Sequence, residues 1–296
     1  MKKLSLIMAT TLALLLAFGF TSCKKEGIFN PKHKIARIYV ETENGEKVLS
    51  ETYAWSKNHL ERIKSELSSE VMTFEYNKNN QITKINSYLD DVLVSYADVT
   101  YKNGKYDNIV IHTPGLADMD FTYSFTYSGK KIKSLTISIP SLGNILDNLD
   151  VKKSYRAIDR ISSFFMPAAL PVETAIKSMN SKASPSQNIT MTYNLNWKDN
   201  NIEQMRADIG NTTITFNGYD SKTNPFQGFM VINPFNLNKN NPATITYNMQ
   251  GEIGTINYSY VYDGDVPVKI TTTFMGNVFP QGIGSWDNNI KYYEYQ

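Results

Sequence analysis

An aromatic residue followed by apolar residues five and eight positions later recurs along the chain. In the segment 125–138, Phe-Thr-Tyr-Ser-Gly-Lys-Lys-Ile-Lys-Ser-Leu-Thr-Ile-Ser, Tyr127 is followed by Ile132 and Leu135. Six other segments carry the pattern, two of them with one extra residue, and they begin at Trp55, Tyr76, Tyr101, Trp197, Tyr247 and Tyr262. Such repetition within one chain indicates a repeated structural unit.

Each copy has the pattern of a β-hairpin. Aromatic and β-branched residues end one run, a turn containing Asn-Gly, Ser-Gly, Asp-Gly or Asn-Asn follows, and a second apolar run begins. In the copy at Tyr101, a two-residue turn at Asn103-Gly104 would place Tyr101 opposite Tyr106. A cross-strand pair of this kind contributes up to about 1 kcal/mol.

The spacing leaves one question open. Positions five and eight after the aromatic residue differ by three, so in a regular strand their side chains would face opposite sides of the sheet. Either a β-bulge shifts the alternation, or both faces of the sheet are partly covered.

Hairpins that cannot bury their own apolar face must pack together. We therefore predict a mainly β domain over residues 35–296, with stacked antiparallel hairpins that form a curved sheet or a barrel-like structure. From 142 to 180 the apolar spacing becomes helical, as at Tyr155, Ile158 and Ile161. This small helical insert is expected to cap or plug one end of the sheet.

The N-terminus predicts export. Lys2 and Lys3 precede the apolar run 4–20, so residues 1–22 are typical of a signal peptide. Thr-Ser-Cys follows directly and resembles the lipobox of bacterial lipoproteins, which implies that Cys23 becomes the lipidated first residue. Residues 23–34 are expected to form a tether.

Composition narrows the partners. Cys23 is the only cysteine, so no intrachain disulfide can form. Without residues 1–22 the chain has 28 basic and 28 acidic residues. This neutrality disfavours nucleic acid as a partner and any general attraction to anionic headgroups, so the predicted link to the membrane is the lipid anchor. Lys24 after the cysteine favours the outer membrane, with its periplasmic and surface faces both open.

These features together resemble a known family. The lipobox, the Tyr-turn-Ile units and the segment 216–229, Phe-Asn-Gly-Tyr-Asp-Ser-Lys-Thr-Asn-Pro-Phe-Gln-Gly-Phe, are similar to uncharacterised Bacteroidetes lipoproteins with a domain of unknown function and YD-like hairpin repeats. The resemblance implies a porin-like, barrel-like antiparallel fold and lends no activity.

Candidate chemistry is sparse. His33, His59 and His112 are not at metal-ligand spacing, and each is expected to be solvated or structural. We predict no metal, no cofactor and no catalytic residue.

Two acidic pairs are expected to lie in solvated surface loops. They are Asp90 with Asp91, and Asp118 with Asp120, although the second pair could offer two oxygens to Ca²⁺. The run from Asp220 to Pro225 is better explained by side chains that bond their own backbone in a turn.

Three aromatic residues are candidates for ligand binding. Trp286 lies in a polar, Gly-rich stretch and could stack on a sugar ring, whereas Phe164 and Phe165 could line an apolar pocket or simply pack in the core. Most of the other aromatic residues are expected to be structural, because β-sheets use tyrosine for pairing.

We therefore predict a lipid-anchored outer-membrane protein that acts as a non-catalytic binding or scaffold module for a glycan or an envelope protein. The alternative is a periplasmic carrier of an apolar ligand. A glycan-processing enzyme is disfavoured, and so is a membrane channel, because the predicted strands are short and the turns are rich in lysine.

Overall fold

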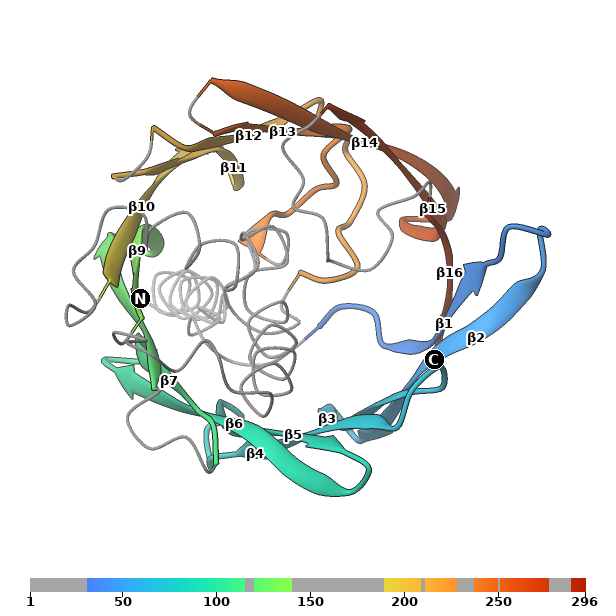
Figure 1. Cartoon of the computed structure of the whole chain (residues 1–296), viewed down its shortest axis with the longest axis horizontal. Coiled ribbons are helices and arrows are strands. Elements are labelled where there is room, and N and C mark those ends of the chain that lie inside the picture. Colours follow the sequence, from blue (N-terminus) through green and yellow to red (C-terminus); the bar gives the residue numbers. More distant parts are fainter. Residues whose placement is uncertain are drawn as a thin grey trace, which may run out of the picture.

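A closed antiparallel barrel is formed by sixteen strands (Figure 1). The computed structural model describes residues 31–114, 120–139, 189–208, 211–227, 237–249, 251–276 and 289–296. The predicted helical insert lies outside these residues. Each strand pairs with the next in sequence, and β16 pairs with β1. The prediction of a mainly β, barrel-like antiparallel fold is confirmed.

The bounds of the strands are as follows. They are β1 (Ile35–Glu41), β2 (Lys47–Ser56), β3 (His59–Ser65), β4 (Glu70–Tyr76), β5 (Ile82–Leu89), β6 (Val92–Lys102), β7 (Lys105–His112), β8 (Phe121–Ser128), β9 (Lys131–Ile139), β10 (Ile189–Lys198), β11 (Asn201–Ala207), β12 (Thr213–Asn217), β13 (Thr244–Met249), β14 (Glu252–Asp263), β15 (Val266–Gly276) and β16 (Asn289–Tyr295).

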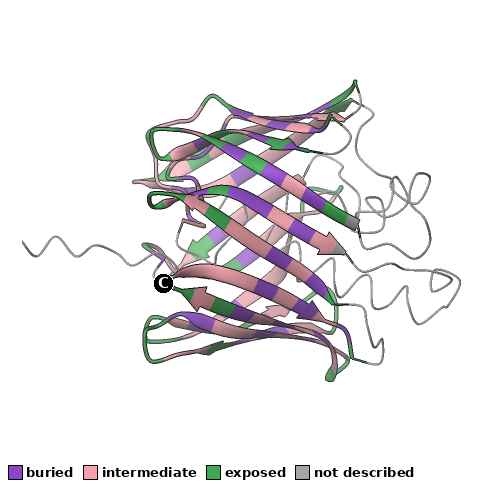
Figure 2. Cartoon of the chain, turned by 90° about the vertical axis from the view of Figure 1, so that its left-hand side faces the viewer, coloured by how far each residue is buried: buried purple, intermediate pink, exposed green. Residues whose placement is uncertain are grey.

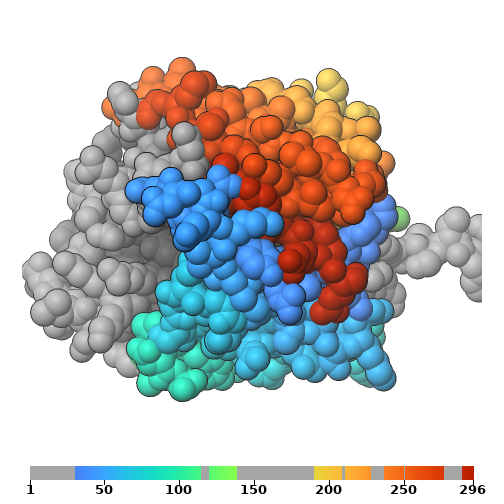
Figure 3. All heavy atoms as spheres, turned by 90° about the vertical axis from the view of Figure 1, so that its right-hand side faces the viewer, coloured from blue at the N-terminus to red at the C-terminus, as the bar shows by residue number. Residues whose placement is uncertain are grey.

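The seam between β1 and β16 closes the barrel. Ile38 lies opposite Tyr293 inside the wall, and Tyr39 lies opposite Tyr292 outside it. Figure 3 shows the N-terminal strands in blue directly against the C-terminal strands in red. Because the barrel is closed, these two strands leave no free edge along the seam.

The two ends of the barrel have different connections. We call the end that carries the turns after the even-numbered strands, the segment 31–34 and Gln296 the hairpin rim. The other end is the opposite rim. At the hairpin rim, Asn103 and Gly104 both have positive φ (55° and 77°). Tyr101 pairs with Tyr106 across this two-residue turn, as predicted.

A β-bulge explains the spacing of five and eight. In the first copy Trp55 pairs with Leu60 but Ala54 pairs with Arg62, which leaves Glu61 as the extra residue. The alternation therefore shifts, and Leu60 and Ile63 are both buried. The pairing register shifts at the matching place in five other copies, those at Tyr76, Tyr101, Tyr127, Trp197 and Tyr262.

The copy at Tyr247 is an exception. Its register is regular: Tyr247 pairs with Gly254, and Asn248 pairs with Ile253. Without a bulge, Ile253 faces outward and is 58% exposed, whereas Ile256 is buried. The predicted hairpin is present in this copy, but its two apolar residues do face opposite sides of the sheet.

The apolar face of the sheet points into the barrel. Phe226, in the β12–β13 connection that Figure 1 shows inside the ring of strands, contacts the ring of Tyr293. Tyr293 belongs to one buried cluster to which each of the sixteen strands contributes, with members such as Ile85, Ile109 and Tyr193. Figure 2 shows buried residues alternating with more exposed ones along the strands.

The outer face carries many hydroxyl and charged side chains, with some exposed apolar residues such as Val261 and Met275 among them. Thr136 lies 3.1 Å from Thr192 across one strand pair, measured between hydroxyl oxygens. Lys84 forms an ion pair with Asp98, with 3.4 Å between Nζ and Oδ1. Arg37 pairs with Glu294 at 3.2 Å across the closing seam.

The hairpin rim carries a ring of eight hydrogen bonds that sequence reasoning missed. In each, a Tyr or Trp side chain donates to a backbone carbonyl of an earlier hairpin or of the N-terminal entry. The donor and acceptor pairs are Trp55–Ile35 (2.8 Å), Tyr76–Leu60 (2.9 Å), Tyr101–Ile82 (2.8 Å), Tyr127–Tyr106 (3.1 Å), Trp197–Ile132 (2.7 Å), Tyr219–Ile202 (2.6 Å), Tyr260–Pro242 (2.8 Å) and Tyr295–Pro267 (2.7 Å).

Most of these acceptors are the residue five or six positions after a repeated aromatic, directly beside a bulge. A bulge removes a residue from the regular ladder and leaves backbone groups without their usual partners. The aromatic side chain of the next hairpin supplies the missing donor. The recurring aromatic residue therefore links one hairpin to the one before it, which explains why the chain repeats it.

The residue before the acceptor often covers the aromatic ring. Lys105 lies over Tyr127 (4.7 Å from Nζ to the ring centroid) and Lys131 lies over Trp197 (5.4 Å). His59 stacks on Tyr76 with ring centroids 4.4 Å apart. The sequence left a solvated or a structural role open for His59, and the stacking on Tyr76 is structural.

We expect Tyr219→Phe to lower the free energy of unfolding by about 1 kcal/mol, because it removes the donor to the Ile202 carbonyl and keeps the ring. Urea unfolding followed by circular dichroism would measure this. The control is Tyr96→Phe, since the hydroxyl of Tyr96 has no hydrogen-bond partner among the described residues. Equal losses in the two variants would contradict a role for the rim bond.

Alkaline pH should unfold the barrel. Burial raises the pKa of eleven tyrosines, which are Tyr76, Tyr101, Tyr106, Tyr193, Tyr219, Tyr247, Tyr258, Tyr260, Tyr262, Tyr293 and Tyr295. The folded state keeps these protons while the unfolded chain releases them near pH 10, so stability is complete below pH 10 and falls above it. Each such tyrosine removes about 1.4 kcal/mol per pH unit.

We therefore expect tyrosine ionisation, followed by absorbance at alkaline pH, to coincide with loss of the β-sheet circular dichroism signal in one steep transition. Gradual ionisation of most tyrosines while the sheet signal persists would contradict this prediction.

Candidate functional site

The β12–β13 connection (218–243) turns into the barrel at the hairpin rim and carries a dense polar network (Figure 1). Its described parts are 218–227 and 237–243. The turn begins at Gly218, where φ is +68° and an added Cβ would lie 2.8 Å from the Cβ of Ala243. Only glycine fits here without displacing the returning chain.

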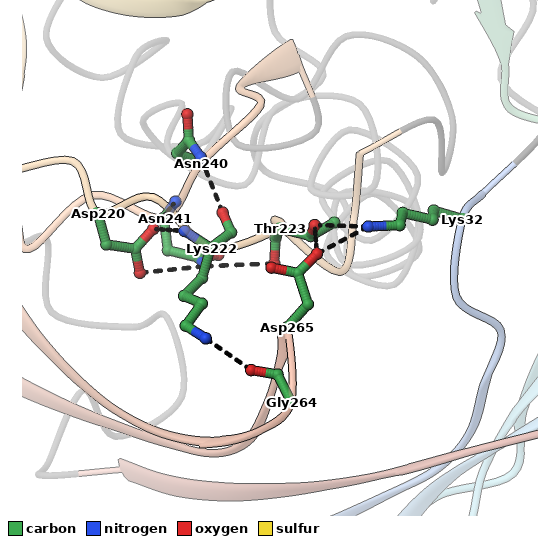
Figure 4. Close-up of polar contacts among 8 residues, drawn as sticks. All are labelled: Lys32, Asp220, Lys222, Thr223, Asn240, Asn241, Gly264 and Asp265. Carbon is green, nitrogen blue, oxygen red and sulfur yellow. Dashed lines mark hydrogen bonds and ion pairs between the residues drawn. The ribbon is translucent and has the colours of Figure 1, made fainter.

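Asp220 is the centre of the network (Figure 4). Its Oδ1 accepts hydrogen bonds from the backbone N–H of Lys222 (3.0 Å) and of Asn241 (3.2 Å). Its Oδ2 accepts from the Asn241 side chain (3.3 Å) and from the Tyr262 hydroxyl. Burial and the neighbouring carboxylate both raise the pKa of Tyr262. With four donors on one carboxylate, Asp220 holds the start and the end of the connection together.

Three asparagines bury their amides within the same connection: Asn224, Asn238 and Asn241. Asn238 Oδ1 accepts from the backbone N–H of Ile202 (2.6 Å), and Asn224 donates to the Asn238 carbonyl (3.1 Å). Asn224 Oδ1 also accepts from the N–H of Phe226 (3.0 Å). The prediction that Asp220 and Asn224 bond their own backbone in turns is confirmed.

Lys32 connects the N-terminal segment to this site. Its Nζ lies 2.7 Å from Asp265 Oδ2 and 3.1 Å from Thr223 Oγ1 (Figure 4). Hydrogen bonds from Lys32 and Thr223 lower the pKa of Asp265 to about 2. Both charged side chains are about half exposed, so the ion pair adds little to stability at physiological ionic strength.

Residues 31–34, which the predicted tether included, pack onto the rim. Pro31 is buried, and the N–H of Gln296 donates to the Lys34 carbonyl (2.9 Å). His33 is half-buried against Tyr295, and burial lowers its pKa. Its Nε2 has no hydrogen-bond partner within the described residues. Residues 23–30 of the predicted tether are not described.

His112 lies on the outer wall between two carboxylates. Its Nδ1 is 2.9 Å from Asp120 Oδ1, and its Nε2 is 3.4 Å from Asp98 Oδ2. Tyr96 stacks on the imidazole with ring centroids 4.6 Å apart. Sequence reasoning gave His112 no partner, because Asp98 and Tyr96 come from the adjacent strand. The cluster fastens the end of the β7–β8 connection to the wall.

The other predicted site residues fall in two groups. Asp90 and Asp91 form the exposed tip of the β5–β6 turn, both with positive φ (50° and 61°). The lipidation site and the possible ligand-binding residues lie outside the described residues, as does one of the paired acids; they are Cys23, Phe164, Phe165, Trp286 and Asp118.

The described residues contain no group of three or more His, Cys, Asp or Glu side chains placed to hold a metal ion. Within the same part of the chain, no helix has the length and apolarity to cross a membrane.

Replacing Asp220 by alanine should lower the free energy of unfolding by about 2 kcal/mol, because Asn241 and Tyr262 would lose a buried acceptor. Asp263→Ala, at an exposed position of the same rim, is the matched control and should change stability by less than about 0.5 kcal/mol. Thermal unfolding followed by circular dichroism compares the two, and a neutral Asp220→Ala would show that the network does not hold the connection.

Comparison with known proteins gives a likeness of fold. No protein-family model matches the chain, and no curated protein matches it. Twenty-three chains among the solved structures match. One is a porin-like protein from Bacteroides vulgatus, with 10% sequence identity and a TM-score of 0.35; the match covers 90% of this chain and 99% of that chain. A likeness at this level concerns the course of the chain alone.

Proposed function

We propose that the chain is an outer-membrane lipoprotein whose barrel stands outside the bilayer and acts as a non-catalytic binding or scaffold module. The observation that carries the proposal is the polarity of the wall, with the apolar face inward and the hydroxyl and charged face outward.

This polarity is the reverse of what a membrane-spanning barrel needs. Such a barrel presents an outward apolar band about 25 Å tall, and a lysine or arginine at its middle costs about 2–4 kcal/mol. Here Lys84 and Asp98 form an ion pair on the outer wall, and Arg206 is exposed. Attachment to the membrane is therefore left to the N-terminus, where the apolar run 4–20 precedes Cys23.

The proposed ligand is a glycan or an envelope protein. The described outer wall offers two tyrosines at the closing seam, Tyr39 and Tyr292, and Lys47 covers both (5.5 and 3.9 Å from Nζ to the ring centroids). Covered rings are poor platforms for a sugar, so the glycan hypothesis rests on Trp286. A hydroxyl-rich wall also suits a polar protein partner.

A carrier of an apolar ligand is the second candidate, and the closed barrel is the observation that favours it. A closed sheet with its apolar face inward encloses an apolar interior, and the mouths of β-barrels are a frequent place for ligand sites. Native mass spectrometry of the purified protein would distinguish the candidates, because a carrier releases an apolar molecule of defined mass and a binding module does not.

The test of the main proposal is lipidation followed by release. In a bacterial host the full chain should incorporate a labelled fatty acid, and Cys23→Ser should not. A specific protease site inserted after Lys25 should then release a folded barrel into detergent-free solution. A labelled barrel that stays in the membrane after cleavage would contradict a position outside the bilayer.

A further inference from the structure

Lysines gather at the hairpin rim. Eleven lysines lie in its turns, at the strand ends beside them or in the segment 31–34, together with four aspartates. They are Lys32, Lys34, Lys57, Lys78, Lys102, Lys105, Lys130, Lys131, Lys198, Lys222 and Lys239, with Asp199, Asp220, Asp263 and Asp265.

The described part of the opposite rim has the reverse charge. Its described turns and strand ends carry ten acidic residues and Lys47 as the single lysine. The acidic residues are Glu41, Glu43, Glu46, Glu66, Glu70, Asp90, Asp91, Asp120, Asp208 and Glu252.

The two rims act as separate electrostatic surfaces. Strands of about eight residues, tilted by about 40°, place the rims roughly 20 Å apart along the barrel axis. The Debye length is about 8 Å at physiological ionic strength, so an approaching surface experiences one rim at a time. The formal neutrality of the chain is therefore an average over two ends of opposite sign, and it does not describe either end.

The charge of the hairpin rim is also available to a partner. Seven of its eleven lysines are exposed, among them Lys57, Lys78, Lys102, Lys198 and Lys239. The eleven lysines outnumber the four aspartates of this rim, and the one ion pair given above, between Asp265 and Lys32, cancels one charge of each sign. The net field of this rim is therefore positive.

The chain enters the barrel at this same rim. Lys34 accepts a hydrogen bond from Gln296, and Lys32 reaches Asp265 in the β14–β15 turn. Residue 23 lies eight residues before residue 31, a span of at most about 28 Å for an extended chain. An anchor at Cys23 would thus hold the basic rim, rather than the acidic one, close to the bilayer.

We propose that the hairpin rim docks on anionic phospholipid headgroups of the bilayer that holds the N-terminus. The proposal rests on the lipid anchor of the proposed function for its choice of partner. Each lysine near an anionic membrane strengthens binding by about fivefold. The acidic rim is then directed away from the membrane, and the outer wall stands in water on all sides.

Amine labelling of the full lipidated chain in vesicles tests the docking. One set of vesicles contains phosphatidylcholine alone, and a second contains about 30% phosphatidylglycerol, an anionic lipid to which lysines respond. Mass spectrometry reads the labelling of each lysine. In the anionic vesicles we expect at least threefold protection of Lys57, Lys78, Lys102 and Lys198, lost at high salt, with Lys47 unprotected. Equal labelling in both vesicles would overturn the proposal.

A pair of variants with the same loss of charge supplies the control. Replacing Lys57, Lys78, Lys102 and Lys198 by glutamine should abolish the effect of the anionic lipid on the remaining rim lysines, such as Lys130. The matched variant replaces Lys47, Arg62, Lys64 and Arg206, on the wall and the opposite rim, and should retain that effect. If both variants lose it equally, total charge and not the rim controls binding.

Failure of the anchor can be told apart from failure of the rim. Pure phosphatidylcholine vesicles should retain the wild-type chain through the lipid anchor at Cys23. Neither set of substitutions should change this retention. Loss of that retention would contradict the proposed function, whereas a rim-dependent response to phosphatidylglycerol would still support the docking surface.

Discussion

The barrel depends on a backbone carbonyl beside a β-bulge, and on the aromatic side chain that donates to it. A bulge keeps both apolar residues of a hairpin on the inner face, but it interrupts the ladder and leaves backbone groups to be satisfied. The repeated aromatic residue of the next hairpin donates a hydrogen bond to the carbonyl beside the bulge, as Tyr76 does to Leu60 and Trp197 does to Ile132. Each unit thus requires its predecessor, and the requirement passes around the ring until Tyr295 reaches Pro267.

The same geometry explains why the interior holds so much tyrosine. The ring of such a residue adds apolar area to the lumen, while its hydroxyl reaches the rim where carbonyls are free. Outside, threonines pair across strands and lysines pair with acids. The closed antiparallel wall therefore turns most of its apolar side chains inward and many polar ones outward.

The hairpins and their turns could be predicted from sequence because they depend on neighbours. Asn103-Gly104 fixed the Tyr101–Tyr106 pair through local turn chemistry alone. The choice between a bulge and a doubly covered sheet remained open, since it depends on pairing across strands, and Tyr247 shows that the same pattern can fold without a bulge.

The long-range contacts of the candidate site could not be predicted from local sequence patterns. Lys32 and Asp265 are separated by 233 positions, and no local signal joins them. The separation of charge between the two rims could have been predicted, however, because successive turns of an up-and-down barrel alternate between its ends. Grouping the turns by that parity separates Lys57 and Lys102 from Glu43 and Asp91.

Closure by the pairing of β1 with β16 has a consequence for how the protein is made. β1 is the first of the described strands and its partner β16 is the last, so one edge of β1 stays unpaired until the strands between them are in place. Until then the sheet has two edge strands with unpaired backbone N–H and C=O groups, and sheets aggregate through such edges. Without β16 the other strands would therefore form an open sheet with two exposed edges, rather than a smaller closed barrel.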